Sequence, residues 1–481
     1  MRRALAALLA GVASLAASDA GAQAPRTWRL DLYHTGGPNA LEVYARDRVV
    51  VEPTPWSGAP RALADTAGPG AYRAELRDTT GRVLWTHVYD TVYEEWTTTA
   101  ERRQRARTFQ ESVRFPAPSA VADLVIARRS GRAAFAELWR TRIDPADPYV
   151  DRGARRGAPA VPIERHGDPA HKVDLVFVGD GYTAAECSAK FGRDARRMLR
   201  ALFAEEPFRS RRADFSVWGV CPPSPASGVS RPSGGLHVAS PAGATYDAFG
   251  SERYVLTFED RALREIASVA PYDALVILAN SATYGGGGIY GAYSTVAVDN
   301  EWADYLFVHE FAHHFAGLAD EYYTSPVAYE APTAVIEPLA PNVTALLDTA
   351  QLKWAPLRTA GTPLPTPWPK AEFEAIERDV QARRVRLRAD RRPESEMSAL
   401  FREERTRTSR LLGASPHARE VGAFQGANYD ARAFYRSEID CIMFTRNPVG
   451  FCAVCRRALS AVIDLFTGVA PAPAPRAAPG G

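Results

Sequence analysis

The pattern of apolar and polar positions changes near residue 145. Before it, short segments alternate with a period of two, as in TFQESVRF at residues 108–115, and tight turns are indicated at residues 78–81 and 129–131. Such alternation places every second side chain on one face of a strand, and tight turns join neighbouring strands into hairpins. We therefore expect residues 25–145 to form an all-β domain that resembles a β-sandwich.

After residue 145 the pattern indicates strands mixed with helices. Residues 146–171 are rich in Pro, Gly and charged side chains, which is typical of a linker. The apolar segments VDLVFVGD, from Val173, and DALVILAN, from Asp273, are predicted strands that precede helical segments. This order predicts a multidomain chain whose second domain, residues 172–468, is α+β, with a mixed sheet and a long helix.

Two segments of the second half depart from this pattern. Residues 370–412 are Arg-rich, highly charged and free of Gly, which predicts long exposed helices within an insertion at about residues 330–430. Residues 469–481 consist mainly of Pro, Ala and Gly, a composition typical of disorder.

The first residues have the pattern of a secretory signal peptide. Arg2 and Arg3 precede a short apolar run, and small residues then predict cleavage after Ala22. Cleavage after Ala24 is the alternative, although Pro25 is a poor residue to follow the cleaved bond. The apolar run is too short to cross a bilayer, and no later stretch is long and apolar enough. We expect a secreted or periplasmic protein without a membrane span, its signal peptide being residues 1–22.

Charge changes this picture little. Lys and Arg number 58 against 56 Asp and Glu, a net charge of +2, and the basic residues are spread along the chain. Because a nucleic-acid surface needs basic residues gathered on one face, we expect no nucleic-acid partner. We expect the protein to be a monomer.

The five cysteines raise a question of pairing. Cys441, Cys452 and Cys455 lie close together near the C-terminus, and an odd total leaves one thiol over. The spacing of Cys452 and Cys455 suits a metal site, but a four-ligand zinc site needs one partner beyond Cys441. In an exported protein we favour a local disulfide from Cys441 to Cys452 or Cys455.

The segment HEFAHHFAGLADEY, residues 309–322, carries the candidate chemistry. On a helix His309 and His313 stand one turn apart, so both imidazoles face the same point and can bind zinc. Glu310 lies beside them, where its carboxylate can take a proton from a zinc-activated water. His314 is rotated away from this face, so we expect it to be structural or exposed to solvent.

The third ligand is predicted from spacing. In zinc peptidases with the pattern HExxHxxGxxH, a glycine ends the helix and the last ligand follows three residues later. Here the glycine is Gly317, one place later than in that pattern, and Asp320 follows it at the same distance. We therefore predict Asp320 as the third ligand, with Glu321 as the alternative.

The segment 309–322, with VDLVFVGDGYTAAE upstream and CIM and FCAVC downstream, resembles the bacterial immunoglobulin-A peptidase family of zinc metallopeptidases. The resemblance covers residues 170–465, and the β-rich segment before them resembles the N-terminal domain of many members. It implies a metzincin-like catalytic domain with a methionine-containing turn beneath the metal, which Met443 fits.

Two further sets of residues fit positions that such an enzyme needs. Gly288, Ile289 and Tyr290 lie where a cleft-lining edge strand is expected, and an extended substrate can pair with such a strand. Tyr435 precedes the methionine turn, where its hydroxyl can donate to the oxyanion of the tetrahedral intermediate.

These observations together predict an exported zinc endopeptidase with a protein or peptide substrate and Zn²⁺ as its cofactor. Glu310 is expected to be the general base. Two alternatives remain open: a zinc amidase that acts on peptidoglycan peptides, and a surface-binding module whose metal is only structural.

Overall fold

The structure is a computed structural model that describes residues 25–469 apart from residues 61, 62, 64, 66, 67, 154–156 and 325–334. The predicted signal peptide therefore lies outside the described residues, as does the predicted disordered tail from residue 470 onward.

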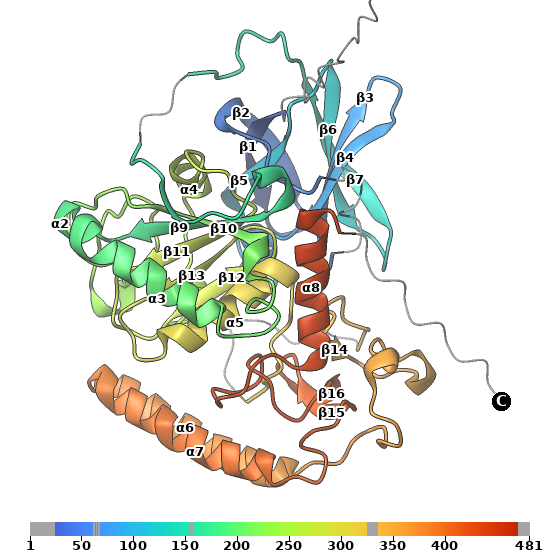
Figure 1. Cartoon of the computed structure of the whole chain (residues 1–481), viewed down its shortest axis with the longest axis vertical. Helices are drawn as coiled ribbons and strands as arrows, with labels where there is room; N and C mark the ends of the chain where they lie inside the picture. The colour runs from blue at the N-terminus through green and yellow to red at the C-terminus, as the bar shows by residue number, and fades with distance from the viewer. Residues whose placement is uncertain are drawn as a thin grey trace, which may run out of the picture.

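The N-terminal region is built from two antiparallel sheets, as the alternating pattern predicts (Figure 1). The first has the order β2-β1-β5 and the second the order β4-β3-β6-β7. The strands are β1 (Arg26–Gly36), β2 (Glu42–Pro55), β3 (Tyr72–Asp78), β4 (Val83–Tyr89), β5 (Arg107–Pro116), β6 (Ala122–Arg129) and β7 (Phe135–Ile143), and the short helix α1 spans Val92–Thr97. Side chains from both sheets share one buried core, which includes Trp28, Leu76 and Phe115.

A six-stranded mixed sheet forms the centre of the second domain. Its order is β12-β13-β11-β9-β10-β8, with the four middle strands parallel and both edge strands antiparallel. The strands are β8 (Val161–Glu164), β9 (Val173–Asp180), β10 (Phe215–Val220), β11 (Ala274–Ala279), β12 (Gly286–Ile289) and β13 (Tyr293–Ala297). Because β8 belongs to this sheet, the prediction that all of residues 146–171 form a linker is wrong for its second half. This Pro-containing segment forms a strand because it pairs with β10, and its composition does not reveal that pairing.

The helices of this domain cover both faces of the sheet and extend below it (Figure 1). They are α2 (Ala184–Glu186), α3 (Gly192–Leu202), α4 (Asp260–Ala267), α5 (Ala303–Ala316), α6 (Lys370–Ala389), α7 (Glu394–Gly413) and α8 (Ala453–Thr467). A small third sheet has the order β14-β16-β15, with β14 at Val343–Thr344, β15 at Phe424–Ala427 and β16 at Asp430–Arg436.

The central strands are buried on both faces, and their alternating side chains enter two different cores. In β11, Val276 and Leu278 join the core formed with α3 and α5, whereas Leu275 and Ile277 join the core of the N-terminal domain. The N-terminal domain thus packs against the face of the sheet opposite α5. Strands buried on both sides are continuous apolar runs, which agrees with the pattern of DALVILAN.

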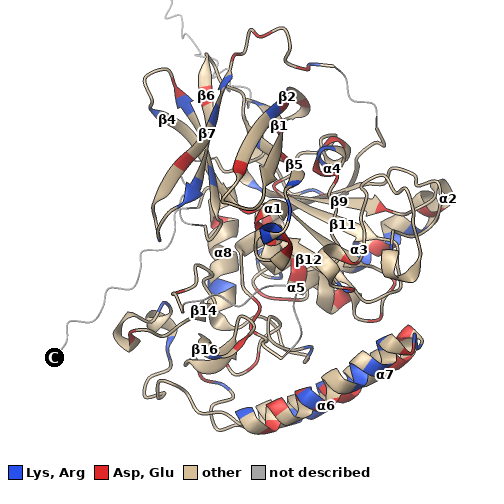
Figure 2. Ribbon diagram, turned by 180° about the vertical axis from the view of Figure 1, so that it is seen from behind, with Lys and Arg blue, Asp and Glu red and all other residues tan. Residues whose placement is uncertain are grey.

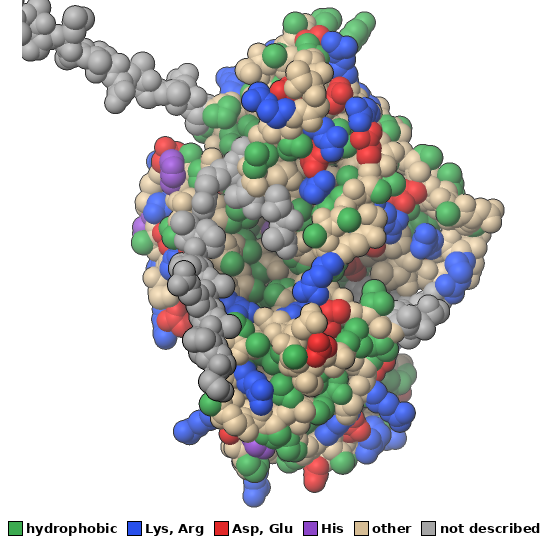
Figure 3. Space-filling model, turned by 90° about the vertical axis from the view of Figure 1, so that its right-hand side faces the viewer, with side chains coloured by type: hydrophobic (Ala, Val, Ile, Leu, Met, Phe, Trp, Pro, Cys, Tyr) green, Lys and Arg blue, Asp and Glu red, His purple; other side chains and the backbone are tan. Residues whose placement is uncertain are grey.

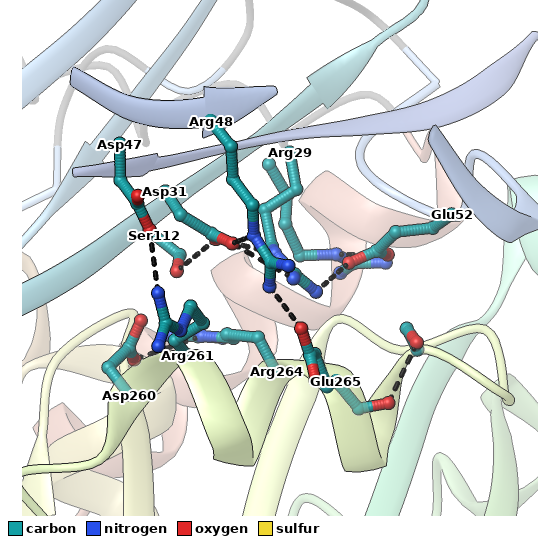
Figure 4. A network of polar contacts seen from close by, with 12 residues as sticks. Arg29, Asp31, Asp47, Arg48, Glu52, Ser112, Asp260, Arg261, Arg264 and Glu265 are labelled. Carbon is teal, nitrogen blue, oxygen red and sulfur yellow. Dashed lines mark hydrogen bonds and ion pairs between the residues drawn. The ribbon is translucent and has the colours of Figure 1, made fainter. Parts of the chain in front are cut away.

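A polar network adds to this apolar contact between the domains (Figure 4). The fully buried Arg29 donates to Asp31 at 2.7 Å and to Glu52 at 3.0 Å. Arg48, which also binds Asp31, forms an ion pair with Glu265 of α4. Since partly exposed ion pairs contribute little stability, this network orients the two domains, and the shared core supplies most of the stabilisation.

The predicted helical insertion contains α6 and α7, which lie side by side as a hairpin (Figures 1 and 2). Both carry basic and acidic residues along their length (Figure 2). They are less exposed than predicted, because Phe373 and Phe401 pack into the main core. This packing holds the hairpin against the second domain.

The surface carries both signs of charge. On the face shown in Figure 3, basic and acidic side chains are interspersed. Within the described part of the chain, no helix is both long and apolar enough to cross a bilayer.

Candidate active site

Helix α5 carries the two histidines and is almost entirely buried. Its apolar residues, including Phe307, Phe311 and Phe315, contribute to the main core. A helix that is apolar nearly all round is stable only when neighbouring elements cover it, and here β12, β13, α3 and α8 do so. The histidine positions are therefore held rigidly from most sides.

Backbone carbonyls orient both histidine rings. Nδ1 of His309 lies 3.0 Å from the carbonyl oxygen of Ile442, and Nδ1 of His313 lies 2.5 Å from that of Leu318. A carbonyl oxygen can only accept, so Nδ1 of each ring is the donor. In the neutral ring this leaves the lone pair on Nε2, the atom that a metal requires.

Asp320 completes a triangle of ligand atoms. Its Oδ1 lies 3.0 Å from Nε2 of His309 and 3.3 Å from Nε2 of His313, and the two nitrogens are 3.1 Å apart. A tetrahedral zinc ion with bonds of about 2.0–2.1 Å separates its ligand atoms by about 3.3 Å. Oδ1 is also buried without a hydrogen-bond partner among the described residues. The three residues therefore fit a metal ion, and we call them the open cluster.

Gly317 makes this geometry possible. It ends α5 in the left-handed conformation, with φ of 58°, and its N–H donates to the carbonyl of His313. A Cβ at this position would lie 2.2 Å from Pro69, so a larger residue does not fit. The turn brings the chain back under the histidines three residues later, which is the spacing used to predict Asp320.

The charges of the open cluster reinforce one another when no metal is bound. Burial opposes a charge on His313, but Asp320 outweighs it and raises the pKa of His313 to about 9. Burial likewise opposes a charge on Asp320, yet the two histidines hold its pKa well below the usual range. Burial raises the pKa of Glu310, with the histidines opposing the shift.

A cleft of about 560 Å³ opens onto this cluster. Glu310 and all three residues of the open cluster line it. Parts of its other walls come from Glu95 and Thr98 of the N-terminal domain, from Glu377 and Glu404 of α6 and α7, and from the small third sheet. The helical insertion therefore forms a wall of the cleft.

Three cleft residues were missed at the sequence level. The Tyr429 hydroxyl donates to Oδ2 of Asp320, and Arg253 donates to the Tyr322 hydroxyl at 3.2 Å. The predicted oxyanion donor, Tyr435, instead pairs with Thr344 and Gln425 in the small sheet and is not among the cleft residues. Tyr322 belongs to the segment 309–322, which was a usable signal, whereas Tyr429 and Arg253 had none.

Strand β12 is an edge strand, as predicted, but the three named residues differ in position. Gly288 lines the cleft, and a Cβ there would lie 2.2 Å from the carbonyl oxygen of Glu310, which explains the glycine. Ile289 is buried in the core. The carbonyl of Tyr290 accepts from Asp90 of the N-terminal domain. We therefore restrict the predicted substrate strand to Gly288.

The remaining predicted residues lie behind the open cluster. His314 is structural: it is buried between Ile289 and Leu275, and burial lowers its pKa to about 3. Met443 is fully buried, and its carbonyl accepts from Glu321 at 2.9 Å. Glu321, the alternative ligand, points away from the histidines toward the cysteines.

The predicted disulfide is wrong. The structure joins Cys187 to Cys221, whereas Cys441, Cys452 and Cys455 are free and buried. Cys187 and Cys221 are 34 residues apart, so sequence proximity did not reveal their pairing.

Fold and site together define a class of protein. A cluster of two histidines and a carboxylate at the floor of a cleft, with a second carboxylate beside it, is a candidate hydrolytic metal centre.

The comparisons with known proteins identify the family. The chain matches IgA Peptidase M64 over residues 161–463 and Peptidase M64 N-terminus over residues 21–140. It therefore belongs to the IgA peptidase M64 family and is a peptidase with this family's two-domain layout. No curated protein matches the chain.

Proposed function

We propose that this peptidase is an exported zinc endopeptidase. The observation that carries the proposal is the convergence of His309, His313 and Asp320 within 3.3 Å, at the floor of a cleft that Glu310 also lines. These three side chains would hold zinc, which would make a nearby water more acidic and polarise the scissile carbonyl.

The chain's own residues supply the remaining chemistry. Glu310 takes the proton of the attacking water and later gives it to the leaving amine, and a raised pKa suits both tasks. Tyr322 accepts a hydrogen bond from Arg253 and faces the same cleft, where its hydroxyl can stabilise negative charge on the substrate oxygen.

Strand β12 offers a place for an extended peptide. The N–H and carbonyl of Gly286 bond outward, to Arg253 and Val255. Backbone groups two residues apart point to the same side of a strand, so those of Gly288 also point away from β13. We infer that Gly288 donates to and accepts from the substrate backbone.

Export is the second part of the proposal. It is supported by the signal-peptide pattern of residues 1–22 and agrees with the Cys187–Cys221 disulfide, a bond typical of oxidising compartments. Mass spectrometry of the mature N-terminus tests it: a start at Gln23 supports cleavage after Ala22, and an intact Met1 in exported protein contradicts it.

The activity is tested with a proteome-derived peptide library and immunoglobulin A, each with and without a zinc chelator. We expect chelator-sensitive internal cuts that share a residue preference and that Glu310→Gln slows by orders of magnitude. Activity on purified peptidoglycan but on no protein would favour the amidase. Zinc-loaded protein that cuts neither would favour the binding module.

A further inference from the structure

Four buried side chains behind the cleft point toward one another. Glu321 follows α5, Cys441 follows β16, and Cys452 and Cys455 begin α8. Each is at most 2% exposed, and their ligand atoms all lie within 4.8 Å of one another. None of the four lines the cleft. We call them the closed cluster.

Two distances in the closed cluster match the edges of a metal tetrahedron. Sγ of Cys441 lies 3.9 Å from Sγ of Cys455, which lies 3.5 Å from Oε1 of Glu321. Zinc bonds of about 2.3 Å to sulfur and about 2.1 Å to oxygen give edges of about 3.8 Å and about 3.6 Å. The cluster is therefore close to the size that zinc requires.

Hydrogen bonds to the sulfur atoms favour thiolates. The Cys452 N–H donates to Sγ of Cys441 at 3.3 Å, and the Cys455 N–H donates to Sγ of Cys452 at 3.3 Å. The Ser437 hydroxyl donates to Sγ of Cys452 at 3.2 Å. Because the thiolate is the form that binds metals, donors aimed at sulfur prepare it for a cation.

Glu321 provides an independent sign of a cation site. Its Oε1 accepts from Asn342 at 3.0 Å, but its Oε2 is buried without a hydrogen-bond partner among the described residues. A buried carboxylate oxygen without compensation is costly, and a bound metal ion supplies that compensation. The fully buried Arg436, which donates to backbone carbonyls, offsets part of the net negative charge that three thiolates and a carboxylate would leave around zinc.

We propose that Glu321, Cys441, Cys452 and Cys455 form a second metal site that binds zinc for a structural purpose. Thiolate ligands select zinc over calcium or magnesium. Four protein ligands close the coordination shell and leave no position for a water or a substrate, so this site has no hydrolytic role. Glu321 is the fourth ligand that the sequence did not reveal for the three cysteines.

The closed cluster ties together the segments that orient the open cluster. Glu321 follows the ligand Asp320 directly, and its N–H donates to Met443. Cys441 precedes Ile442, whose carbonyl holds the ring of His309. Zinc at the closed cluster would therefore fasten two supports of the catalytic ligands to the start of α8.

The test is a metal count on the purified mature chain, with a His309→Ala/His313→Ala double variant that keeps the closed cluster intact. We expect two zinc ions per chain in the wild type and one in the double variant. Cobalt(II) exchanged into the double variant should give the intense near-ultraviolet absorption of thiolate-to-cobalt charge transfer. Adding Cys452→Ser should remove this absorption.

The inference is overturned by a double variant that folds but holds no zinc and shows no thiolate absorption. It is equally overturned if peptide mapping without reduction finds Cys441 joined to Cys452 or Cys455. Both readouts use chains with all three thiols, so they stand even where Cys452→Ser fails to fold. No substrate is involved, so the result is independent of the proposed activity.

Discussion

Asp320 and Glu321 are neighbours in the chain, yet their side chains enter two clusters of different chemistry. The open cluster has two histidines and a carboxylate and faces a cleft. The closed cluster has three cysteines and a carboxylate and lies wholly in the core. A metal centre that catalyses hydrolysis needs a free coordination position, whereas a structural centre needs none. One peptide unit therefore separates a candidate site for chemistry from a candidate site for stability.

The largest expected effect concerns Glu310, because the closed cluster has no counterpart to this base. Glu310→Gln should lower kcat/KM by about 10²–10⁴-fold while leaving the zinc content unchanged, since the amide cannot accept the proton. Peptide hydrolysis and metal analysis measure the two effects. Glu301→Gln is the matched control: its exposed carboxylate pairs with Arg402, and its loss should leave activity intact. Comparable turnover in Glu310→Gln would reject the mechanism.

The next effect separates the two clusters directly. Asp320→Asn should remove the open-cluster zinc and the activity while leaving the closed-cluster zinc bound. Glu321→Gln should remove the closed-cluster zinc and destabilise the fold by about 4 kcal/mol, for zinc present at about 1,000 times its dissociation constant. Denaturant unfolding and metal analysis of both variants measure this. The comparison fails if the two variants lose the same metal ion.

A third prediction uses pH. The pKa of His313 in the metal-free protein is about 9, so below that pH a proton must leave before zinc can bind. Zinc affinity of the open cluster should therefore rise about tenfold per pH unit from about pH 7 and level off above about pH 9. Chelator competition at several pH values measures this. An affinity independent of pH in this range would contradict it.

The same shift has the opposite effect on the metal-free fold. A raised pKa stabilises the folded state fully below the unfolded value of about 6.5. That contribution is lost as the pH rises through about 9. Unfolding of the metal-free protein across this range should show stability falling with pH, and His313→Gln should flatten the trend.

The smallest effects concern hydroxyl groups that touch one ligand in each cluster. Tyr429→Phe removes the donor to Asp320, and Ser437→Ala removes the donor to Cys452. Loss of such a partner typically costs about tenfold in metal affinity. Each variant should weaken zinc binding at its own cluster and spare the other, as measured by chelator competition. Equal weakening of both clusters by either variant would show that they are not separate.

Local patterns predicted much of the fold because they report local physics. Alternation predicted the two N-terminal sheets, and the four-residue spacing of His309 and His313 placed both rings on one helix face. The distance from Gly317 to Asp320 predicted the third residue of the open cluster, since a helix end and its turn are set by neighbouring residues. The position of Glu310 beside the histidines was predicted from the same helix.

Other features required contacts that no local pattern contains. Strand β8 is defined by pairing with β10, across about fifty residues. Tyr429 rather than Tyr435 reaches Asp320 because Tyr429 lies in the turn that joins β15 to β16. The disulfide partners and the carboxylate of the closed cluster were missed for the same reason. Neighbouring cysteines in sequence suggested a bond that their arrangement in the core does not make.

The sequence by itself determined the β-rich first domain, the mixed second domain and the helix with His309, Glu310 and His313. These depend on periodicity and on spacing within one or two turns, and both can be read directly from a sequence. Only the tertiary structure decided that Glu321, the residue after the predicted ligand Asp320, joins cysteines more than a hundred residues away. Which of two adjacent carboxylates meets which partners depends on how three distant segments pack, and packing is a property of the folded chain alone.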